Sequence, residues 1–405
     1  MSDGASAPPV LVTGLGALCG FGRGVEALLA GLRRGRPAFG EPTVFDAANH
    51  RTRLASEVPE DAPSQPWAPG LSRGDRFAVH AANEAVAHAG LTPSALTRAG
   101  VFFGSSNGGL LEGEAFFRRL RAGQARLGLR SVASHQNNGP GDAVARALGC
   151  TGPVLTCSSA CTSANMALAA ALCALRRGEC DVALAGGADA LSEVTYAGFN
   201  ALRAIDPAPA RPFRADRAGL SMGEGAGVLV LETARHAAAR GAVALAELAG
   251  AGSTCDAHHM SAPKDDGRGP FEAMRRALAD ADELPSAVSF VNAHGTGTPH
   301  NDVVEARALR ELLGDLVRDV PVTSTKSLVG HLLGACGGLE AVACVLGLLH
   351  REVHPTAGPG DADPELGLDL VLGGVRRLAA ARVAMSNNLA FGGNNCTIVL
   401  RRAAS

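Results

Sequence analysis

The sequence carries almost no excess of charge of either sign. Its 405 residues include 37 lysines and arginines against 39 aspartates and glutamates, a formal net charge of −2 at pH 7, and no run of like charges stands out. Proteins that bind nucleic acids or anionic membranes through a broad surface usually show a basic excess. The balance argues against both kinds of partner and leaves room only for a local basic patch that faces one acidic protein.

Long apolar runs and metal-binding cysteine spacings are also missing. The first residues lead almost directly into PVLVTGLGALCG without a basic start, and no stretch approaches the roughly 20 uncharged apolar residues of a membrane span. We therefore expect a cytoplasmic protein. The ten cysteines show neither zinc-finger nor CxxC spacing. We expect most of them to be reduced and packed as small apolar side chains, including Cys157, Cys173 and Cys180.

No low-complexity linker divides the chain. Strand-like runs such as DVALAGGAD alternate with helical runs such as NMALAAALCALRRG, which is the α/β pattern. The alternation starts again near residue 245, so we predict two similar halves, residues 1–245 and 246–405, packed on each other. A dinucleotide site is not predicted, because the glycines of GLGALCG fall one residue out of register for that fingerprint.

One cysteine stands at a corner of the predicted fold. In LTCSSACTSANMALAAALCALRRG, a short apolar run turns through small polar residues at Cys161 and continues as an alanine-rich helix. A thiol at a helix N-terminus lies among unpaired N–H groups, which favour an anion. Those conditions lower a thiol pKa and produce a nucleophile, whereas the alternative is a cysteine buried behind a turn.

Two histidines stand in settings unlike the helix faces where structural histidines are common. His294 lies in VNAHGTGTPHND and His331 in STKSLVGHLLGACGG, each just after a strand-like run and among glycines and hydroxyl residues. An imidazole in such a loop is free to point into a site. Together with an activated cysteine, the two histidines predict acyl-transfer chemistry.

Two further features near these histidines each have two interpretations. Lys326 and Glu340 flank His331 and form either a buried ion pair that orients the histidine loop or an ordinary surface lysine and helix glutamate. The stretch AMSNNLAFGGNNCTIVL places a Phe-Gly-Gly turn between two strands. Such a turn either brings backbone N–H groups close to a ligand, as in an oxyanion hole, or is a simple tight hairpin.

The chain resembles the β-ketoacyl-acyl carrier protein synthases, the condensing enzymes of the thiolase-like superfamily, along nearly its whole length. The resemblance lies in ordered motifs: VLVTGLGAL, SSACTSAN, PFRADRAGLSMGEGAGVLVLE, DAHHMSAP, NAHGTGTPHND, STKSLVGHLLGACGGLEA and FGGNN. It implies an α/β protein with the thiolase fold, in which two similar βαβαβαββ halves stack as α-β-α-β-α. Members of the family are usually dimers.

The resemblance also implies a reaction, the decarboxylative Claisen condensation. Cys161 would take an acyl chain from an acyl carrier protein as a thioester. His294 and His331 would assist decarboxylation of malonyl-carrier protein and stabilise the resulting enolate, because positioned N–H donors stabilise negative charge in a dry site. The backbone N–H groups of Cys161 and Phe391 would form the oxyanion hole. No metal or redox cofactor is needed, since the carrier protein brings the phosphopantetheine.

Other residues match supporting positions of the family. Lys326 and Glu340 match its supporting lysine and glutamate, and Thr296 and Thr298 match threonines that hydrogen-bond the phosphopantetheine arm. Carrier proteins are acidic, so we expect a basic patch near the tunnel mouth, with Arg203 of GFNALRAID as our candidate.

The gating loop departs from the family pattern. Elongating members commonly read Phe-Gly-Phe-Gly-Gly-Thr-Asn, and here Leu389, Ala390 and Asn394 replace the first Phe, the hinge Gly and the Thr around the gate residue Phe391. Alanine has a narrower φ/ψ range than glycine, and Leu389 is smaller than phenylalanine, so the gate and the neighbouring wall are expected to differ. Primary fatty-acid synthesis and a type II polyketide route, including polyene synthesis, are the two alternatives, and the altered gate favours the second.

Cys161 and His331 help to decide which kind of enzyme in the thiolase-like superfamily the chain resembles. Cys161 argues against a chain-length factor, although the chain could pair with one, and the partner is a second copy or such a subunit. His331 stands where thiolases have a basic cysteine and where initiating synthases have asparagine, so an elongating enzyme is favoured and Cys336 is assigned to packing. From another class, the alternative is a catalytically inactive subunit that only binds the carrier protein.

Overall fold

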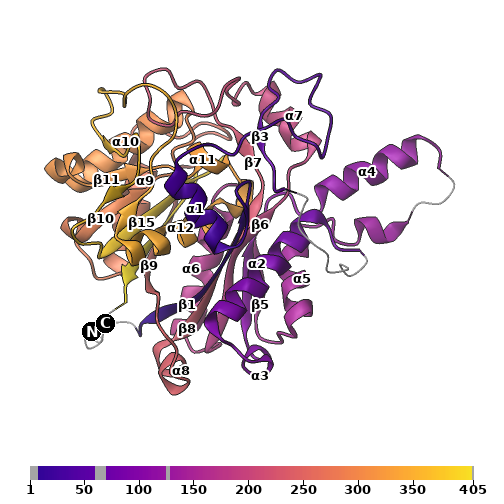
Figure 1. The fold of residues 1–405 in the computed structure, drawn as a ribbon, viewed down its shortest axis with the longest axis horizontal. Coiled ribbons are helices and arrows are strands. Elements are labelled where there is room, and N and C mark those ends of the chain that lie inside the picture. The colour runs from indigo at the N-terminus through magenta and orange to yellow at the C-terminus, as the bar shows by residue number, and fades with distance from the viewer. Residues whose placement is uncertain (1–7, 60–69, 125–127, 404–405) are drawn as a thin grey trace.

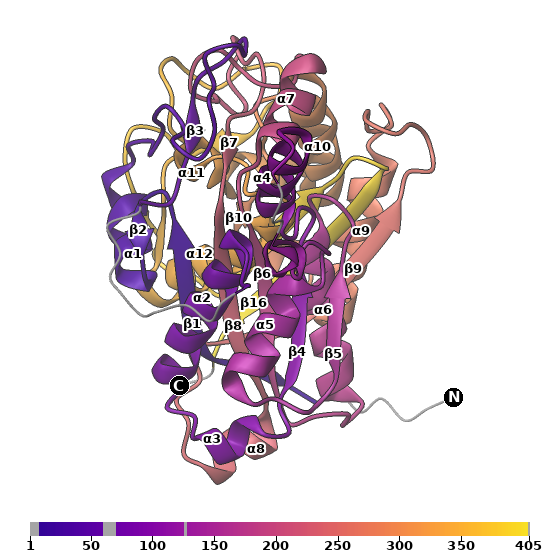
Figure 2. The ribbon, with the colours of Figure 1, turned by 90° about the vertical axis from the view of Figure 1, so that its right-hand side faces the viewer.

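Five layers, alternately helical and stranded, make up the structure, a computed structural model that describes residues 8–59, 70–124 and 128–403 (Figure 1 and Figure 2). The main strands form one continuous sheet that divides into two parts, one in each half of the chain, here called the first and the second sheet. The first has the order β5 (Val154–Cys157), β4 (Gly100–Gly104), β6 (Val182–Asp189), β8 (Gly225–Thr233) and β1 (Val10–Cys19). The second has the order β11 (Pro321–Thr323), β10 (Val288–Asn292), β15 (Val383–Leu389), β16 (Asn394–Arg402) and β9 (Ala246–Cys255), with β13 (Asp369–Leu370) beyond β11.

The two sheets repeat one topology. Within each half, the five main strands lie in the order 3-2-4-5-1, counted along the chain. In each order, the first three strands are parallel to one another. The fourth strand is antiparallel to the third, and the fifth is antiparallel to the fourth. The sheets meet along one edge, where β1 pairs with β9. This repetition and the layered stacking confirm the predicted fold class.

Helices cover both outer faces and fill the space between the sheets. The outer face of the first sheet carries α2 (Arg73–Ala89) and α5 (Gly139–Leu148), and that of the second carries α9 (Arg268–Asp280) and α10 (Pro299–Leu313). The central layer is formed by α6 (Ser163–Arg176) and α12 (Cys336–His350). Each central helix follows the third strand of its half, so α6 and α12 occupy equivalent places in the repeat.

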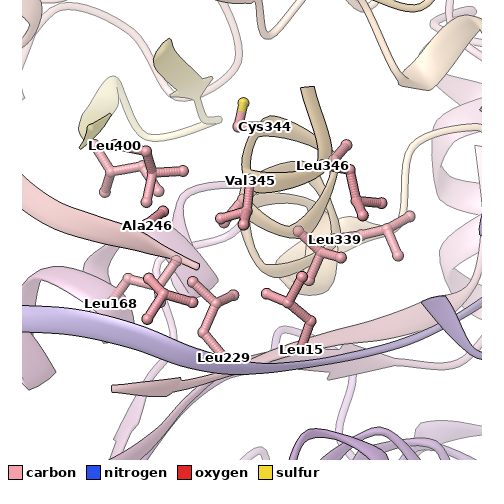
Figure 3. Packing of buried hydrophobic residues seen from close by; sticks show 14 of the residues in the cluster. Leu15, Leu168, Leu229, Ala246, Leu339, Cys344, Val345, Leu346 and Leu400 are labelled. Carbon is pink, nitrogen blue, oxygen red and sulfur yellow. The ribbon is translucent and has the colours of Figure 1, made fainter. Parts of the chain in front are cut away.

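The central helix α12 is apolar on every side because both sheets pack on it. Figure 3 shows its residues Leu339, Val345 and Leu346 between side chains of the first sheet and of the second. Among the described residues, Leu333–His350 is the one helical stretch apolar and long enough to cross a membrane, and 89% of it is buried inside the protein. It is therefore a core helix.

Two glycines of the GLGALCG motif have a packing role. A Cβ on Gly14 would lie 2.1 Å from the Ala85 carbonyl oxygen, and one on Gly16 would lie 1.8 Å from that of Ala81. The absence of side chains lets α2 lie directly on β1. The motif therefore serves helix-on-sheet packing.

The remaining elements are short or peripheral. Helix α4 (Leu110–Arg121) projects from the body of the first half (Figure 1). The other helices are α1 (Val25–Arg34), α3 (Pro93–Leu96), α7 (Glu193–Ala201), α8 (Ala234–Ala239) and α11 (Lys326–Val329), with 3-10 turns at Leu129–Val132, Pro285–Ala287, Gly314–Arg318 and Leu333–Ala335. Short strands are β2 (Gly22–Arg23), β3 (Ala55–Ser56), β7 (Met222–Gly223), β12 (Glu352–Val353) and β14 (Arg376–Arg377).

Candidate active site

Cys161 lies in the tight connection between β5 and α6. The preceding residue, Ala160, has a φ of 49°, a left-handed conformation that is uncommon for alanine. Hydroxyl groups hold the turn: Ser163 Oγ donates to the Ala160 carbonyl at 2.6 Å and accepts from the Ser159 N–H at 2.9 Å. The thiol is thus presented from a strained but well-supported corner and is buried, with 8% of the residue exposed.

The thiol pKa differs from the sequence-based expectation. Burial raises the pKa of Cys161 to about 11, and the Lys326 ammonium and the N–H groups of Phe391 and Cys161 lower it only in part. The predicted lowering by the helix N-terminus is therefore wrong for the substrate-free site, because desolvation of the thiolate outweighs the nearby positive charge. The thiol must lose its proton as it attacks.

The other cysteines follow the packing interpretation only in part, since Cys173 and Cys255 are exposed and Cys157 is half-buried. All ten are unpaired, and Cys180 and Cys336 are buried. Cys173, however, is exposed on α6, so the prediction that it packs in the core is wrong. The alanine-rich sequence of that helix does not reveal which side faces the solvent.

His294 follows β10 in a loop fixed by a buried carboxylate. Glu305 of α10 accepts the N–H groups of His294 and Gly295, both at 2.8 Å. Burial and the charges of Lys326 and His331 hold the pKa of His294 well below its usual value. Its Nδ1 has no hydrogen-bond partner among the described residues, so the backbone is fixed while the tautomer is free to follow a substrate.

His331 lies in the connection between β11 and α12, the equivalent in the second half of the place that Cys161 occupies in the first. Its N–H donates to the Ser221 carbonyl at 2.7 Å, and its Nδ1 accepts the Leu333 N–H at 3.0 Å. Burial and Lys326 lower its pKa to about 3. The imidazole is neutral, and with Nδ1 occupied as an acceptor its proton lies on Nε2.

Lys326 and Glu340 form a buried ion pair, so the surface interpretation of these residues is excluded. Lys326 Nζ lies 2.5 Å from Glu340 Oε1, each side chain is 2% exposed, and Glu340 Oε2 also accepts from Asn388 Nδ2 at 2.7 Å. Burial acts to lower the pKa of Lys326, but the Glu340 charge more than offsets it. The lysine therefore stays charged and acts on the thiol and on both imidazoles.

The turn between β15 and β16 covers the thiol. The backbone N–H of Phe391 acts to lower the pKa of the Cys161 thiol, while Phe391 is 37% exposed and its ring stacks on Phe199 of α7 with 5.7 Å between ring centroids. The segment 256–263 packs against this turn, since the Gly392 N–H donates to the Met260 carbonyl at 2.8 Å. The Phe-Gly-Gly turn is thus more than a tight hairpin.

A cavity of about 310 Å³ joins these groups to the solvent. Its wall includes Thr296 and Thr298, whose hydroxyl groups lie 2.9 Å apart, and Arg203. The structure brings to this cavity every predicted site residue except the Lys326 and Glu340 pair, namely Cys161, His294, His331, Thr296, Thr298, Arg203, Leu389, Ala390 and Phe391.

The thiol and the two imidazoles also have the composition of a zinc site. One donor atom from each of Cys161, His294 and His331 lies within 4.8 Å of the others. The Lys326 ammonium already lowers the pKa of both imidazoles, and the same repulsion opposes a second cation. The arrangement fits a protonated nucleophile beside two neutral imidazoles better than a metal centre.

Three supporting residues were missed by the sequence analysis: Glu305, Asn388 and Asp189. Glu305 holds the His294 loop, Asn388 holds Glu340, and Asp189 accepts the Gly334 N–H three residues after His331. Glu305 falls in the helix after NAHGTGTPHND, where it has the appearance of an ordinary helix glutamate. A charged or amide residue within an apolar strand, as for Asp189 and Asn388, was the available signal.

Comparison with known proteins identifies the family. Residues 7–237 match the family described as Beta-ketoacyl synthase, N-terminal domain, and residues 245–359 match Beta-ketoacyl synthase, C-terminal domain. The chain is 38% identical over 408 residues to 3-oxoacyl-[acyl-carrier-protein] synthase 2 of Synechocystis sp., covering 97% of this chain and 98% of that protein. It is also 38% identical over 400 residues to Nodulation protein E of Rhizobium meliloti, covering 97% and 99%.

Solved structures agree with the sequence comparison. The ishigamide ketosynthase/chain length factor is similar at a TM-score of 0.93 with 34% identity over 99% of this chain and 100% of that one. A Beta-ketoacyl synthase from Burkholderia phymatum is similar at 0.91 with 34% identity, over 98% and 100%. The chain therefore belongs to the β-ketoacyl synthase family, the acyltransferases that condense two acyl groups through a new carbon–carbon bond.

Proposed function

We propose that Cys161 carries the acyl chain during condensation. In the first step, Cys161 Sγ attacks the carbonyl carbon of an acyl thioester on a carrier protein, the bond to the phosphopantetheine sulfur breaks, and the thiol proton ends on that sulfur. The N–H groups of Cys161 and Phe391 hold the oxyanion. Support comes from the Phe391 N–H, which acts to lower the pKa of the Cys161 thiol, and from the cavity that both residues line, since an N–H group beside the sulfur is placed to receive an oxyanion.

The second step is assigned to the two imidazoles. The bond between the malonyl carboxylate and its methylene carbon breaks, CO₂ leaves, and the electron pair moves onto the thioester oxygen as an enolate. Nε2–H of His331, together with His294, donates to that oxygen. The enolate carbon then attacks the acyl-Cys161 carbonyl, the bond from that carbon to the sulfur breaks, and the thiolate takes up one proton from water. The single observation that carries this proposal is the pair of neutral, buried imidazoles whose ring centroids lie 5.5 Å apart beside the thiol.

The substrates reach the site on a carrier protein. We propose that the phosphopantetheine arm enters through the cavity and is held by the hydroxyl groups of Thr296 and Thr298, with Arg203 on the docking surface outside. Arg203, both threonines and Cys161 all line one cavity, which supports this path. No other cofactor is part of the proposal.

The altered gating loop and the partner subunit are the features that distinguish primary fatty-acid synthesis from a polyketide route. Leu389 and Ala390 line the cavity beside Cys161, so the altered gating loop changes the wall that an acyl chain meets. We propose a specialised type II polyketide or polyene route, with a second copy or a chain-length-factor-like subunit as partner. The similarity to the ishigamide ketosynthase/chain length factor supports that choice.

The division of the chain and its compartment complete the proposal. We place the boundary at residues 245 and 246, with the nucleophile in 1–245 and the two histidines in 246–405. The repeat of strand order supports it, since the second sheet begins with β9 at Ala246.

We propose a cytoplasmic location, supported by ten unpaired cysteines.

Intact-mass analysis tests the proposed function. The purified protein is mixed with acyl-carrier proteins of several chain lengths and then with malonyl-carrier protein, while acyl-Cys161 and the extended product are followed. We expect loading followed by a two-carbon extension. Loading without extension would indicate a missing partner subunit or the wrong extender, and an absence of loading would favour the inactive binding subunit.

Matched variants assign the steps. Cys161→Ala is expected to abolish loading and condensation, whereas Cys150→Ala, which changes another buried cysteine that does not line the cavity, keeps both. His294→Ala and His331→Ala are expected to lose decarboxylation more than loading. Loss mainly of loading in the histidine variants would contradict the proposed roles.

A further inference from the structure

The buried carboxylate of Asp189 lies next to the turn that follows His331 and does not line the cavity that contains Cys161. Asp189 ends β6 in the first half of the chain and is fully buried. Its donors among the described residues are all neutral: Ser105 Oγ at 2.7 Å, Ser106 Oγ at 2.9 Å, the Ser106 and Asn107 N–H groups at 2.9 Å, and the Gly334 N–H at 2.6 Å. Three of its partners are consecutive residues that follow β4, and the fourth belongs to the other half.

The Gly334 contact connects this carboxylate to the active site. Gly334 directly follows Leu333, whose N–H donates to His331 Nδ1 at 3.0 Å. Leu333 has a φ of 56°, a strained conformation for a leucine that persists only where its surroundings impose it. The Gly334 N–H is held by both Asp189 Oδ2 and Ser106 Oγ, the latter at 3.0 Å, so the first half holds the strained turn from behind.

The fit at this contact is close. A Cβ on Gly334 would lie 2.7 Å from Asp189 Oδ2 and 2.7 Å from the Ser106 nitrogen. The turn therefore cannot move toward the carboxylate, and the hydrogen bond prevents it from moving away. Hydrogen bonds of the His331 backbone with Ser221 and Gly223 fix the other side of the turn.

We infer that Asp189 is a positioning residue for His331: its carboxylate fixes the turn at residues 331–334, which keeps the Leu333 N–H on Nδ1 and the imidazole proton on Nε2. The inference rests on the proposed role of His331 in decarboxylation. Asp189 contacts no substrate and acts through the turn alone. It also makes His331 dependent on the docking of the two halves.

A carboxylate suits this place better than an amide. Both Asp189 oxygens receive donors, and an asparagine would direct its NH₂ group at the N–H or hydroxyl groups that now donate to it. Asp189→Asn should therefore lose the Gly334 contact or force the turn to shift. A displacement of about 1 Å in a catalytic group can cost about 100-fold in rate.

The test compares two half-reactions of the full-length protein. For Asp189→Asn, we expect the rate of acyl transfer to Cys161 to stay within about twofold of wild type, and malonyl-carrier protein decarboxylation to fall about 100-fold. The acid limb of the decarboxylation profile should also move to higher pH, because a vacated Nδ1 is free to take a proton. A purely structural role would leave that limb in place.

Controls separate this inference from general damage and from the proposed function. Asp75→Asn removes a buried carboxylate that caps α2 in the same half and should keep both rates. Ser106→Ala removes one acceptor of the Gly334 N–H and should lower decarboxylation alone, by a smaller factor; it provides the readout if Asp189→Asn does not fold. Equal loss of both half-reactions, or no change in either, would overturn the inference, whereas a His331→Ala variant that still decarboxylates would overturn the proposed role of His331 itself.

Discussion

The buried ion pair of Lys326 and Glu340, next to the candidate active site, allows stability and the proposed catalysis to be tested with the same variants. Lys326→Met removes the ammonium and leaves Glu340 buried with a hydrogen bond from Asn388. Removal of one partner of a buried pair typically costs about 3–5 kcal/mol. Because Asn388 still solvates the carboxylate, we expect a loss of about 3 kcal/mol in the free energy of unfolding. The double variant Lys326→Met/Glu340→Gln keeps an acceptor for Asn388 and should lie within about 1 kcal/mol of wild type.

The same substitutions move the pH dependence of decarboxylation. The Lys326 charge contributes to the low pKa of His331, about 3, and of His294. Without that charge the imidazoles are protonated at higher pH, closer to the ordinary value of about 6.5, and the acid limb of the rate profile moves up. Chemical denaturation measures the first effect and malonyl-carrier protein decarboxylation from pH 4 to 8 measures the second. Wild-type stability together with a wild-type acid limb in Lys326→Met would refute the reasoning.

Three further predictions concern acid stability, the gate and docking. His354 is buried and its pKa is lowered to about 4. Because the unfolded chain binds a proton at this histidine near pH 6.5 and the folded chain does not, the free energy of unfolding falls as the pH drops from 6.5 toward 4. His354→Gln should therefore flatten the dependence of this free energy on pH by about 1.4 kcal/mol per pH unit in that range, and an unchanged slope in denaturation curves would contradict this. Phe199→Ala removes a ring pair worth about 0.5–1.5 kcal/mol from Phe391, so alkylation of Cys161 by iodoacetamide should accelerate about 2- to 10-fold by intact mass, and an unaltered rate would show that the stack does not control access. Arg203→Glu should weaken carrier-protein binding at least about 10-fold at low salt and less at high salt; affinity that stays unchanged in a titration would remove Arg203 from the docking surface.

The sequence indicated the side chains of the candidate active site more readily than the environment that sets their pKa values. Cys161, His294 and His331 stand in short motifs whose residue types reveal a strand end and a loop, so their local structure was predictable. The pKa of Cys161 was not, because it depends on burial in the folded chain and on Lys326 and Phe391, which are far away along the sequence. The prediction from the helix N-terminus was therefore wrong in direction.

The contacts of the supporting residue Asp189 could not be predicted either, because they also join distant parts of the chain. Asp189 and Gly334 are 145 residues apart, and only the stacking of two sheets brings them into contact. The restart of the pattern near residue 245 predicted two similar halves, whereas periodicity alone does not contain the common strand order 3-2-4-5-1. Buried polar residues inside apolar strands were the available signal for such long-range contacts, and Asp189 and Asn388 both carried it.

The central position of α12 has a consequence for how the protein unfolds. Its side chains face β8 of the first sheet and β15 and β16 of the second, so one helix covers the inner faces of both sheets. Separation of the halves would expose both inner faces at once, which makes partial unfolding as costly as global unfolding. We therefore expect amide protons of both sheets to exchange with a common free energy, as one cooperative unit.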